Sequence, residues 1–156
     1  MGVSLREITP ENFRECVNLK VADEQENFVA PNVMSIAQSK IYPTMTIRAV
    51  YAGDDLVGFT MFGLDTDDNR YYLVRLMIDA RFQGRGYGKA ALSEIIEAMK
   101  RIEDCGEIYL SFVDGNTAAE RLYRSVGFDL TGETNSYGET IMRLAINNNA
   151  KHRLLI

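Results

Sequence analysis

Three glycines lie within five residues in the segment FQGRGYGKAAL (82–92), between a predicted strand and a predicted helix. Glycine destabilises the interior of helices and strands, so such a cluster indicates a special demand on the backbone. Backbone N–H groups that no Cβ covers can converge on an anion at the positive end of a helix. The segment therefore predicts either an anion-binding loop or a tight turn with solvated basic side chains. The cluster consists of Gly84, Gly86 and Gly88, interleaved with Arg85 and Lys89.

The glycine spacing excludes two common nucleotide-binding loops. A dinucleotide-binding loop reads Gly-x-Gly-x-x-Gly after a first strand, with an acidic residue about 20 positions further on. Here the pattern is Gly-x-Gly-x-Gly, and it follows several predicted strands. A P-loop requires Ser or Thr after its lysine, whereas Ala90 follows Lys89.

The rest of the chain alternates between strand-like and helix-like periodicity, with no repeat and no linker rich in Gly, Ser or Pro. We predict a first helix capped by Thr9, with Pro10 at its first position. The order β-α-α-β-β-β-α-β-α-β-β predicts a mixed α/β fold, with a central sheet flanked by helices. One domain should cover 1–146, with 147–156 as a C-terminal tail. Strands are predicted at 3–9, 46–52, 56–64, 70–78, 107–113, 128–134 and 139–146, and helices at 10–21, 32–42 and 116–126. A further helix is predicted after the glycine loop, where an apolar stripe at helical spacing covers 92–102.

Composition narrows the function classes. The chain of 156 residues is 46% hydrophobic and 25% charged, with a formal net charge of −5. An acidic chain lacks the basic face that nucleic acids require, and no apolar run has the roughly 20 residues of a membrane helix. The N-terminus lacks the apolar core of a signal peptide. Two cysteines and a single histidine provide neither a disulfide framework nor a histidine-based metal site. We therefore expect a cytoplasmic protein without a metal, a nucleic-acid partner or a membrane partner.

Two sequence blocks carry a family resemblance. The first is Gln83-Gly84-Arg85-Gly86-Tyr87-Gly88, and the second is Asn116-x-x-Ala119-x-x-x-Tyr123-x-x-x-Gly127-Phe128. Both resemble motifs of the GNAT superfamily of N-acetyltransferases, in the same order and on the same kinds of element. The resemblance implies the GNAT acyl-CoA N-acyltransferase fold, with a mostly antiparallel sheet, to about Ile146. It also implies acetyl-CoA, whose pyrophosphate the glycine loop holds.

Three shorter segments resemble the bacterial spermine/spermidine (diamine) N-acetyltransferases. They are QENFVAP (25–31), RLMID (75–79) and EIYLS (107–111). The implied acceptor is a small cationic amine, bound near Glu24 and Glu26 unless these belong to a solvated acidic loop. Eukaryotic diamine acetyltransferases have an acidic pair in the strand before the loop, whereas this chain has Val74-Arg75 there. Because of that difference, the resemblance does not identify the residue that acts as general base.

The resemblance also implies direct acetyl transfer in a ternary complex. Tyr123 matches the general acid that protonates the leaving thiolate, and its alternative role is packing a helix on the sheet. Asn116 could serve as a helix cap, a cofactor contact or both. A backbone N–H near Leu76 or Met77, at a bulge, is the implied oxyanion donor. The implied cofactor-binding residues are Leu76, Met77, Ile78, Gln83, Gly84, Arg85, Gly86, Tyr87, Gly88, Lys89, Asn116, Ala119 and Tyr123.

Two other functions are compatible with the sequence. The acceptor could be a protein N-terminus, a lysine or an aminoglycoside. Alternatively, the chain could bind acetyl-CoA as a sensor without catalysis, although a sensor has no need of a proton donor at Tyr123. Because members of this superfamily often dimerise, a homodimer is a further expectation.

Overall fold

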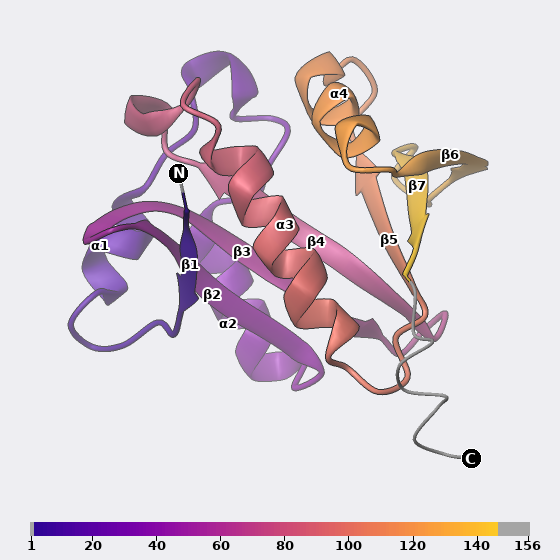
Figure 1. Cartoon of the computed structure of the whole chain (residues 1–156), viewed down its shortest axis with the longest axis horizontal. Coiled ribbons are helices and arrows are strands. Elements are labelled where there is room, and N and C mark those ends of the chain that lie inside the picture. Colours follow the sequence, from indigo (N-terminus) through magenta and orange to yellow (C-terminus); the bar gives the residue numbers. More distant parts are fainter. Residues whose placement is uncertain (1, 147–156) are drawn as a thin grey trace.

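One seven-stranded sheet runs through the molecule in the order β1-β2-β3-β4-β5-β7-β6 (Figure 1). The computed structural model describes residues 2–146, so the predicted tail at 147–156 lies outside the described residues. Neighbouring strands are antiparallel except for β4 and β5. The predicted mixed, mostly antiparallel sheet flanked by helices is therefore confirmed. Within 2–146 no helix is long and apolar enough to span a bilayer.

The order of helices and strands agrees with the prediction, apart from two added 3-10 turns. The strands are β1 (Ser4–Arg6), β2 (Met45–Ala52), β3 (Asp55–Asp65), β4 (Arg70–Ile78), β5 (Glu107–Phe112), β6 (Asp129–Thr134) and β7 (Thr140–Ala145). The helices are α1 (Phe13–Asn18), α2 (Asn32–Ile41), α3 (Tyr87–Lys100) and α4 (Thr117–Ser125), and the 3-10 turns are η1 (Asp23–Gln25) and η2 (Ala80–Phe82).

The predicted start of the first helix is wrong, because α1 begins at Phe13 and its N-cap position is Asn12. The Asn12 side chain is buried, and its Oδ1 accepts a hydrogen bond from the N–H of Thr9 at 2.7 Å. Its Nδ2 donates to the carbonyl of Glu7 at 3.0 Å. These local bonds hold the intervening residues in a turn, as asparagine often does in competition with helix.

The two faces of the sheet carry different helices. On one face, α3 and α4 pack on alternate β5 residues, among them Ile108, Leu110 and Phe112. On the other face, residues of α1 and α2 pack against Phe59 and Met77. Figure 1 shows α3 crossing one face of the sheet while α2 lies behind it. We call these the α3/α4 face and the α1/α2 face.

The parallel strands β4 and β5 form a fork. Within the described chain they pair at one position, Tyr72 opposite Tyr109. Beyond that pair the strands diverge, while β5 continues to pair with β7 (Figure 1). Among residues 2–146, no strand therefore pairs with the edge of β4 beyond Tyr72.

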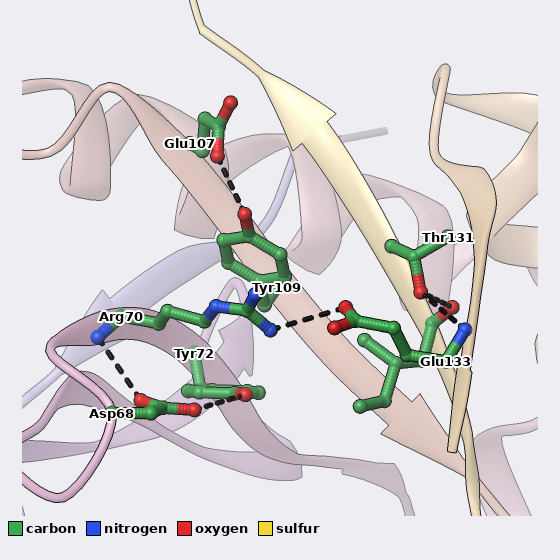
Figure 2. Close-up of polar contacts among 8 residues, drawn as sticks. Asp68, Arg70, Tyr72, Glu107, Tyr109, Thr131 and Glu133 are labelled. Carbon is green, nitrogen blue, oxygen red and sulfur yellow. Dashed lines mark hydrogen bonds and ion pairs between the residues drawn. The ribbon is translucent and has the colours of Figure 1, made fainter. Parts of the chain in front are cut away.

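Polar side chains hold the closed end of this fork together, as Figure 2 shows. The rings of Tyr72 and Tyr109 lie 5.8 Å apart, and the Tyr72 hydroxyl donates to Asp68 at 2.7 Å. Arg70 lies 4.4 Å from the centroid of the Tyr109 ring and forms an ion pair with Glu133 on β6 at 3.2 Å. Three strands are thereby joined at the point from which the fork opens.

A β-bulge in β4 changes which side chains face each layer. Met61 on β3 pairs with Arg75, and the next β3 residue pairs with Leu73, so Val74 is the extra residue. Leu73 packs on the α3/α4 face, whereas Val74 and Met77 pack on the α1/α2 face. Because side chains alternate along a strand, Arg75 shares the α1/α2 face with Met77. The bulge thus turns two consecutive side chains toward that face.

Asp79 ties the end of β4 to the segment after α1. Its buried carboxylate accepts hydrogen bonds from the N–H of Lys20 at 3.0 Å and from the N–H and Nε of Arg81 at 3.0 and 2.8 Å. Burial acts to raise the pKa of Asp79, but these donors outweigh it and hold that pKa below its usual range. Asp79 therefore fixes the approach to the glycine loop.

Replacing Asp79 with alanine should destabilise the fold by about 3 kcal/mol at pH 7, because two backbone N–H groups lose their partner. The native pKa lies below the unfolded value of about 3.9, so this stabilisation exists above that pH and disappears as the pH falls through the native pKa. Urea unfolding of both proteins at pH 7 and pH 3 should show the difference shrinking. Asp129→Ala, an exposed control, should change stability by less than about 0.5 kcal/mol. An equal loss at both pH values would contradict this role.

Candidate active site

A cavity of about 1530 Å³ occupies the open end of the β4–β5 fork. Its walls come from residues 72–78 of β4, the glycine loop, the end of β5 and α4. The segment between α1 and α2, the β3–β4 turn and the β6–β7 hairpin also contribute. Residues far apart in the sequence thus surround one space.

The glycine loop opens into this cavity through its backbone. Gly84 and Gly86 have φ values of 78° and 83°, in the left-handed region that favours glycine. Gly86 is the N-cap residue of the 14-residue helix α3, and both glycines line the cavity. An added Cβ at either position would meet no atom within 4 Å, so the approach to this backbone is open.

The basic residues of the loop lie outside the lining of the cavity. The lining includes Tyr87 and Gly88 but neither Arg85 nor Lys89. Both basic side chains are exposed, and Arg85 donates to the carbonyl of Arg81 at 3.4 Å. Within the loop, the cavity wall therefore consists of backbone and uncharged side chains rather than formal positive charge.

Gln83 fastens the loop to two neighbours. Its Nε2 donates to the carbonyl of Ile78 at the end of β4 and to Oε1 of Gln25 in η1, both at 2.9 Å. Gln25 in turn accepts a hydrogen bond from the N–H of Ala22 at 3.2 Å. A single amide thus connects the loop, β4 and the segment that forms one wall of the cavity.

The unpaired edge of β4 runs along the cavity. Leu76, Met77 and Ile78 all line it. The bulge expected near Leu76 or Met77 lies slightly earlier, at Val74. The buried Thr60 hydroxyl donates to the carbonyl of Arg75 at 2.8 Å and helps to hold the strand just beyond the bulge.

Helix α4 brings three of the predicted residues to the cavity. Asn116 accepts a hydrogen bond from the N–H of Ala119 at 3.2 Å and caps the helix, and both residues line the cavity. Tyr123 lines it as well, with its ring centroid 5.9 Å from that of Phe128. Desolvation by the surrounding protein raises the pKa of Tyr123 to about 12. Its phenol is therefore protonated at neutral pH, as a proton donor must be.

Carboxylates are the prevailing charge on the lining. Glu26 contributes to it from the segment between α1 and α2, whereas Glu24 does not. Among the described lining residues, Arg75 is the one basic side chain. This surplus of negative charge favours a cationic ligand. The other lining carboxylates, which sequence analysis did not identify, are Asp65, Asp67, Asp68, Asp114 and Glu139.

Comparison with known proteins identifies the family. Residues 3–128 match the acetyltransferase (GNAT) family. The chain belongs to this family. The assignment made from the two sequence blocks is confirmed, and this GNAT protein is accordingly an acetyltransferase, with acetyl-CoA as the family's acetyl donor.

Individual relatives agree with the family assignment. The spermine/spermidine N(1)-acetyltransferase of Bacillus subtilis is 32% identical over 148 residues, which cover 91% of this chain and 97% of the relative. The spermidine N-acetyltransferase of Vibrio cholerae, solved with CoA and spermine, superimposes with a TM-score of 0.72 at 18% identity, covering 94% and 96% of the two chains. An aminoglycoside acetyltransferase solved with coenzyme A gives 0.78 at 15% identity, covering 97% and 99%. At these identities the two structures establish the GNAT fold alone.

Proposed function

We propose that this GNAT enzyme transfers the acetyl group of acetyl-CoA directly to a primary amine of a polyamine such as spermidine or spermine. The observation that carries the proposal is the cavity through the β4–β5 fork, with the glycine loop at one part of its wall and an excess of carboxylates at others. The similarity to a spermine/spermidine acetyltransferase over 91% of this chain supports the same acceptor.

The loop and the strand edge fit coenzyme A. The N–H groups from Gln83 to Lys89 at the start of α3 provide donors and a positive helix end for the diphosphate. The free edge of β4 at Leu76, Met77 and Ile78 offers backbone partners to the amides of the pantetheine arm. A cavity of about 1530 Å³ is large enough for an extended ligand of this size.

The remaining residues have distinct roles in the transfer. A backbone N–H of β4 near Leu76 or Met77 stabilises the oxyanion that forms on the thioester carbonyl, an interaction worth about 3 kcal/mol. Tyr123 donates its proton to the departing thiolate. Asn116 caps α4 beside the donor, and Glu26 attracts a distant ammonium group of the acceptor. Glu24, outside the lining, would act through long-range attraction.

The test is a thiol-release assay with acetyl-CoA and a panel of acceptors. The panel contains spermidine, spermine, a free peptide N-terminus, lysine and an aminoglycoside, and mass spectrometry identifies each acetylated product. We expect thiol release with spermidine or spermine to exceed that with the other acceptors by at least about tenfold in kcat/KM. Thiol release with another acceptor alone would support acetyl transfer but would contradict a polyamine as the acceptor. No release with any acceptor, despite coenzyme A binding, would favour a sensor.

A further inference from the structure

The side chain of Ser111 marks the acceptor side of the fork. Ile108, Leu110 and Phe112 pack on the α3/α4 face, so the intervening Ser111 points toward the α1/α2 face. Ser111 lies two residues beyond Tyr109, the last β5 residue paired with β4. It is therefore the first side chain on that face where the fork opens.

Glu139 is held at this position by two side chains. Its Oε1 accepts hydrogen bonds from the Ser111 hydroxyl at 3.1 Å and from Nδ2 of Asn135 at 2.8 Å. Asn135 is itself fixed, since its Oδ1 accepts the N–H groups of Tyr137 and Glu139, both at 3.0 Å. The hairpin before β7 thus presents one carboxylate in a defined orientation.

The second oxygen of Glu139 is available to a ligand. Within the described chain no hydrogen bond or ion pair forms at Oε2, and the residue lines the cavity. Arg75 is close enough for the charge of Glu139 to affect it: burial lowers the pKa of Arg75, and Glu139 acts in the opposite direction. Arg75 nevertheless directs its Nη1 to the carbonyl of Val74 at 3.0 Å, and its buried Nε has no partner in the described chain.

The other lining carboxylates are engaged differently or less firmly placed. Asp65 accepts the N–H of Asp67, and Asp68 accepts the hydroxyl of Tyr72, so both stabilise the β3–β4 turn and the closed end of the fork. Glu26 and Asp114 are exposed. The charged and titratable groups on the lining from every element are Glu26, Tyr42, Asp65, Asp67, Asp68, Tyr72, Arg75, Tyr87, Asp114, Tyr123, Tyr137 and Glu139.

We propose that Glu139 binds the reacting ammonium group of the acceptor and takes up its proton, an assignment that rests on the proposed acetyl transfer to an amine. Glu139 and Tyr123 contribute to the same cavity from the two faces of the sheet. The base and the acid thus flank the fork in which the acetyl thioester would lie.

The step balances with these two groups. Oε2 of Glu139 receives one proton from the ammonium, which leaves a neutral amine with a free electron pair. That pair forms the C–N bond to the acetyl carbon, and the C–S bond then breaks toward sulfur. The departing thiolate takes a proton from Tyr123, and the nitrogen loses its second proton, which restores the phenol directly or through water. The net products are the amide, the free thiol and one proton released from Glu139 to solvent.

Glu139→Gln tests this assignment with little change in shape, because the amide oxygen can still accept from Ser111 and Asn135. At pH 7 and saturating acetyl-CoA, kcat/KM for spermidine should fall about 100-fold, the usual size of a general-base contribution. The variant depends on amine that is already neutral, so its rate should rise about tenfold per pH unit toward the amine pKa of about 10. The wild-type profile should be flatter. Calorimetry with coenzyme A present should show spermidine binding weakened by about tenfold.

Glu133→Gln is the matched control, since it removes the same charge from the same hairpin, outside the lining of the cavity. It should change kcat/KM by less than about twofold. If the wild type acetylates spermidine and E139Q has the same rate and pH profile as the wild type, the assignment of Glu139 is overturned while the proposed function stands. If the E139Q rate is lower than the wild-type rate by the same factor at every pH, the loss reflects a folding defect. That result would also overturn the assignment of Glu139 as the base. A wild-type protein that acetylates no amine would overturn both.

Discussion

Replacing Tyr123 with phenylalanine should lower kcat for acetyl transfer by about 100-fold or more, within the range of general acid catalysis. The hydroxyl is the one group removed, and the ring keeps its contact with Phe128. Burial raises the pKa of Tyr123 to about 12, so the phenol holds its proton throughout the neutral range. The same desolvation disfavours a departing thiolate, whose pKa in water is about 8.5, and so increases its demand for a proton.

This prediction separates catalysis from packing. Calorimetry should find the affinity of Tyr123→Phe for coenzyme A within about threefold of wild type, because the diphosphate and pantetheine contacts lie elsewhere. The wild-type rate should show no loss between pH 8 and 10 that is due to Tyr123, since a phenol is protonated below its pKa of about 12. Tyr109→Phe, at the closed end of the fork, removes a hydroxyl bound to Glu107 and should leave kcat unchanged within about twofold. Equal rates for Tyr123→Phe and wild type would assign Tyr123 to packing.

Replacing Gly86 with valine should weaken coenzyme A binding at least tenfold. At a φ of 83° a residue with a Cβ costs about 1–2 kcal/mol, and a β-branched residue more. The strain would pull the N-cap of α3 out of this conformation and turn the first N–H groups of the helix away from the cavity. Because 1.4 kcal/mol corresponds to a factor of ten in affinity, the loss should be clear in calorimetry.

Gly53→Val controls for backbone strain alone. Gly53 has a φ of 61° in the β2–β3 turn and lies outside the lining of the cavity. The control should lower the melting temperature to a similar extent as Gly86→Val while coenzyme A affinity stays within about twofold. Equal losses of affinity in both variants would show that general destabilisation, not the loop, causes the effect.

The sequence predicted those parts of the fold that depend on local patterns. The bounds of β4 agree with the prediction, because its apolar and aromatic run is flanked by clear turn residues. The α4 cap at Asn116 and the glycine junction before α3 were also predicted, since each depends on neighbouring residues. The predicted start of α1 was wrong because the Asn12 side chain bonds back to the backbone of Glu7 and Thr9 and holds residues 10–12 in a turn.

The acceptor side of the site could not be predicted in the same way. Glu139 reaches the cavity because the hairpin bonds across to Ser111, 28 positions earlier, and no local pattern encodes that contact. Because of the bulge at Val74, the Arg75 side chain lies on the same face of the sheet as Val74. Strict alternation along β4 would have predicted the opposite face. Arg85 and Lys89 are exposed and lie outside the lining, whereas Gly84 and Gly86, both with positive φ, line the cavity. The positions of these side chains depend on contacts and strand pairing between distant parts of the sequence, and not on local composition.

The central claim is that the β4–β5 fork holds the acetyl donor with its sulfur between Tyr123 and Glu139. A crystal structure of the protein with coenzyme A and spermidine tests it most directly. The diphosphate should lie about 2.7–3.2 Å from N–H groups between Gln83 and Lys89, with the pantetheine arm along Leu76–Ile78 and a spermidine nitrogen at Glu139. A diphosphate bound away from the start of α3, or a pantetheine arm outside the fork, would contradict the claim.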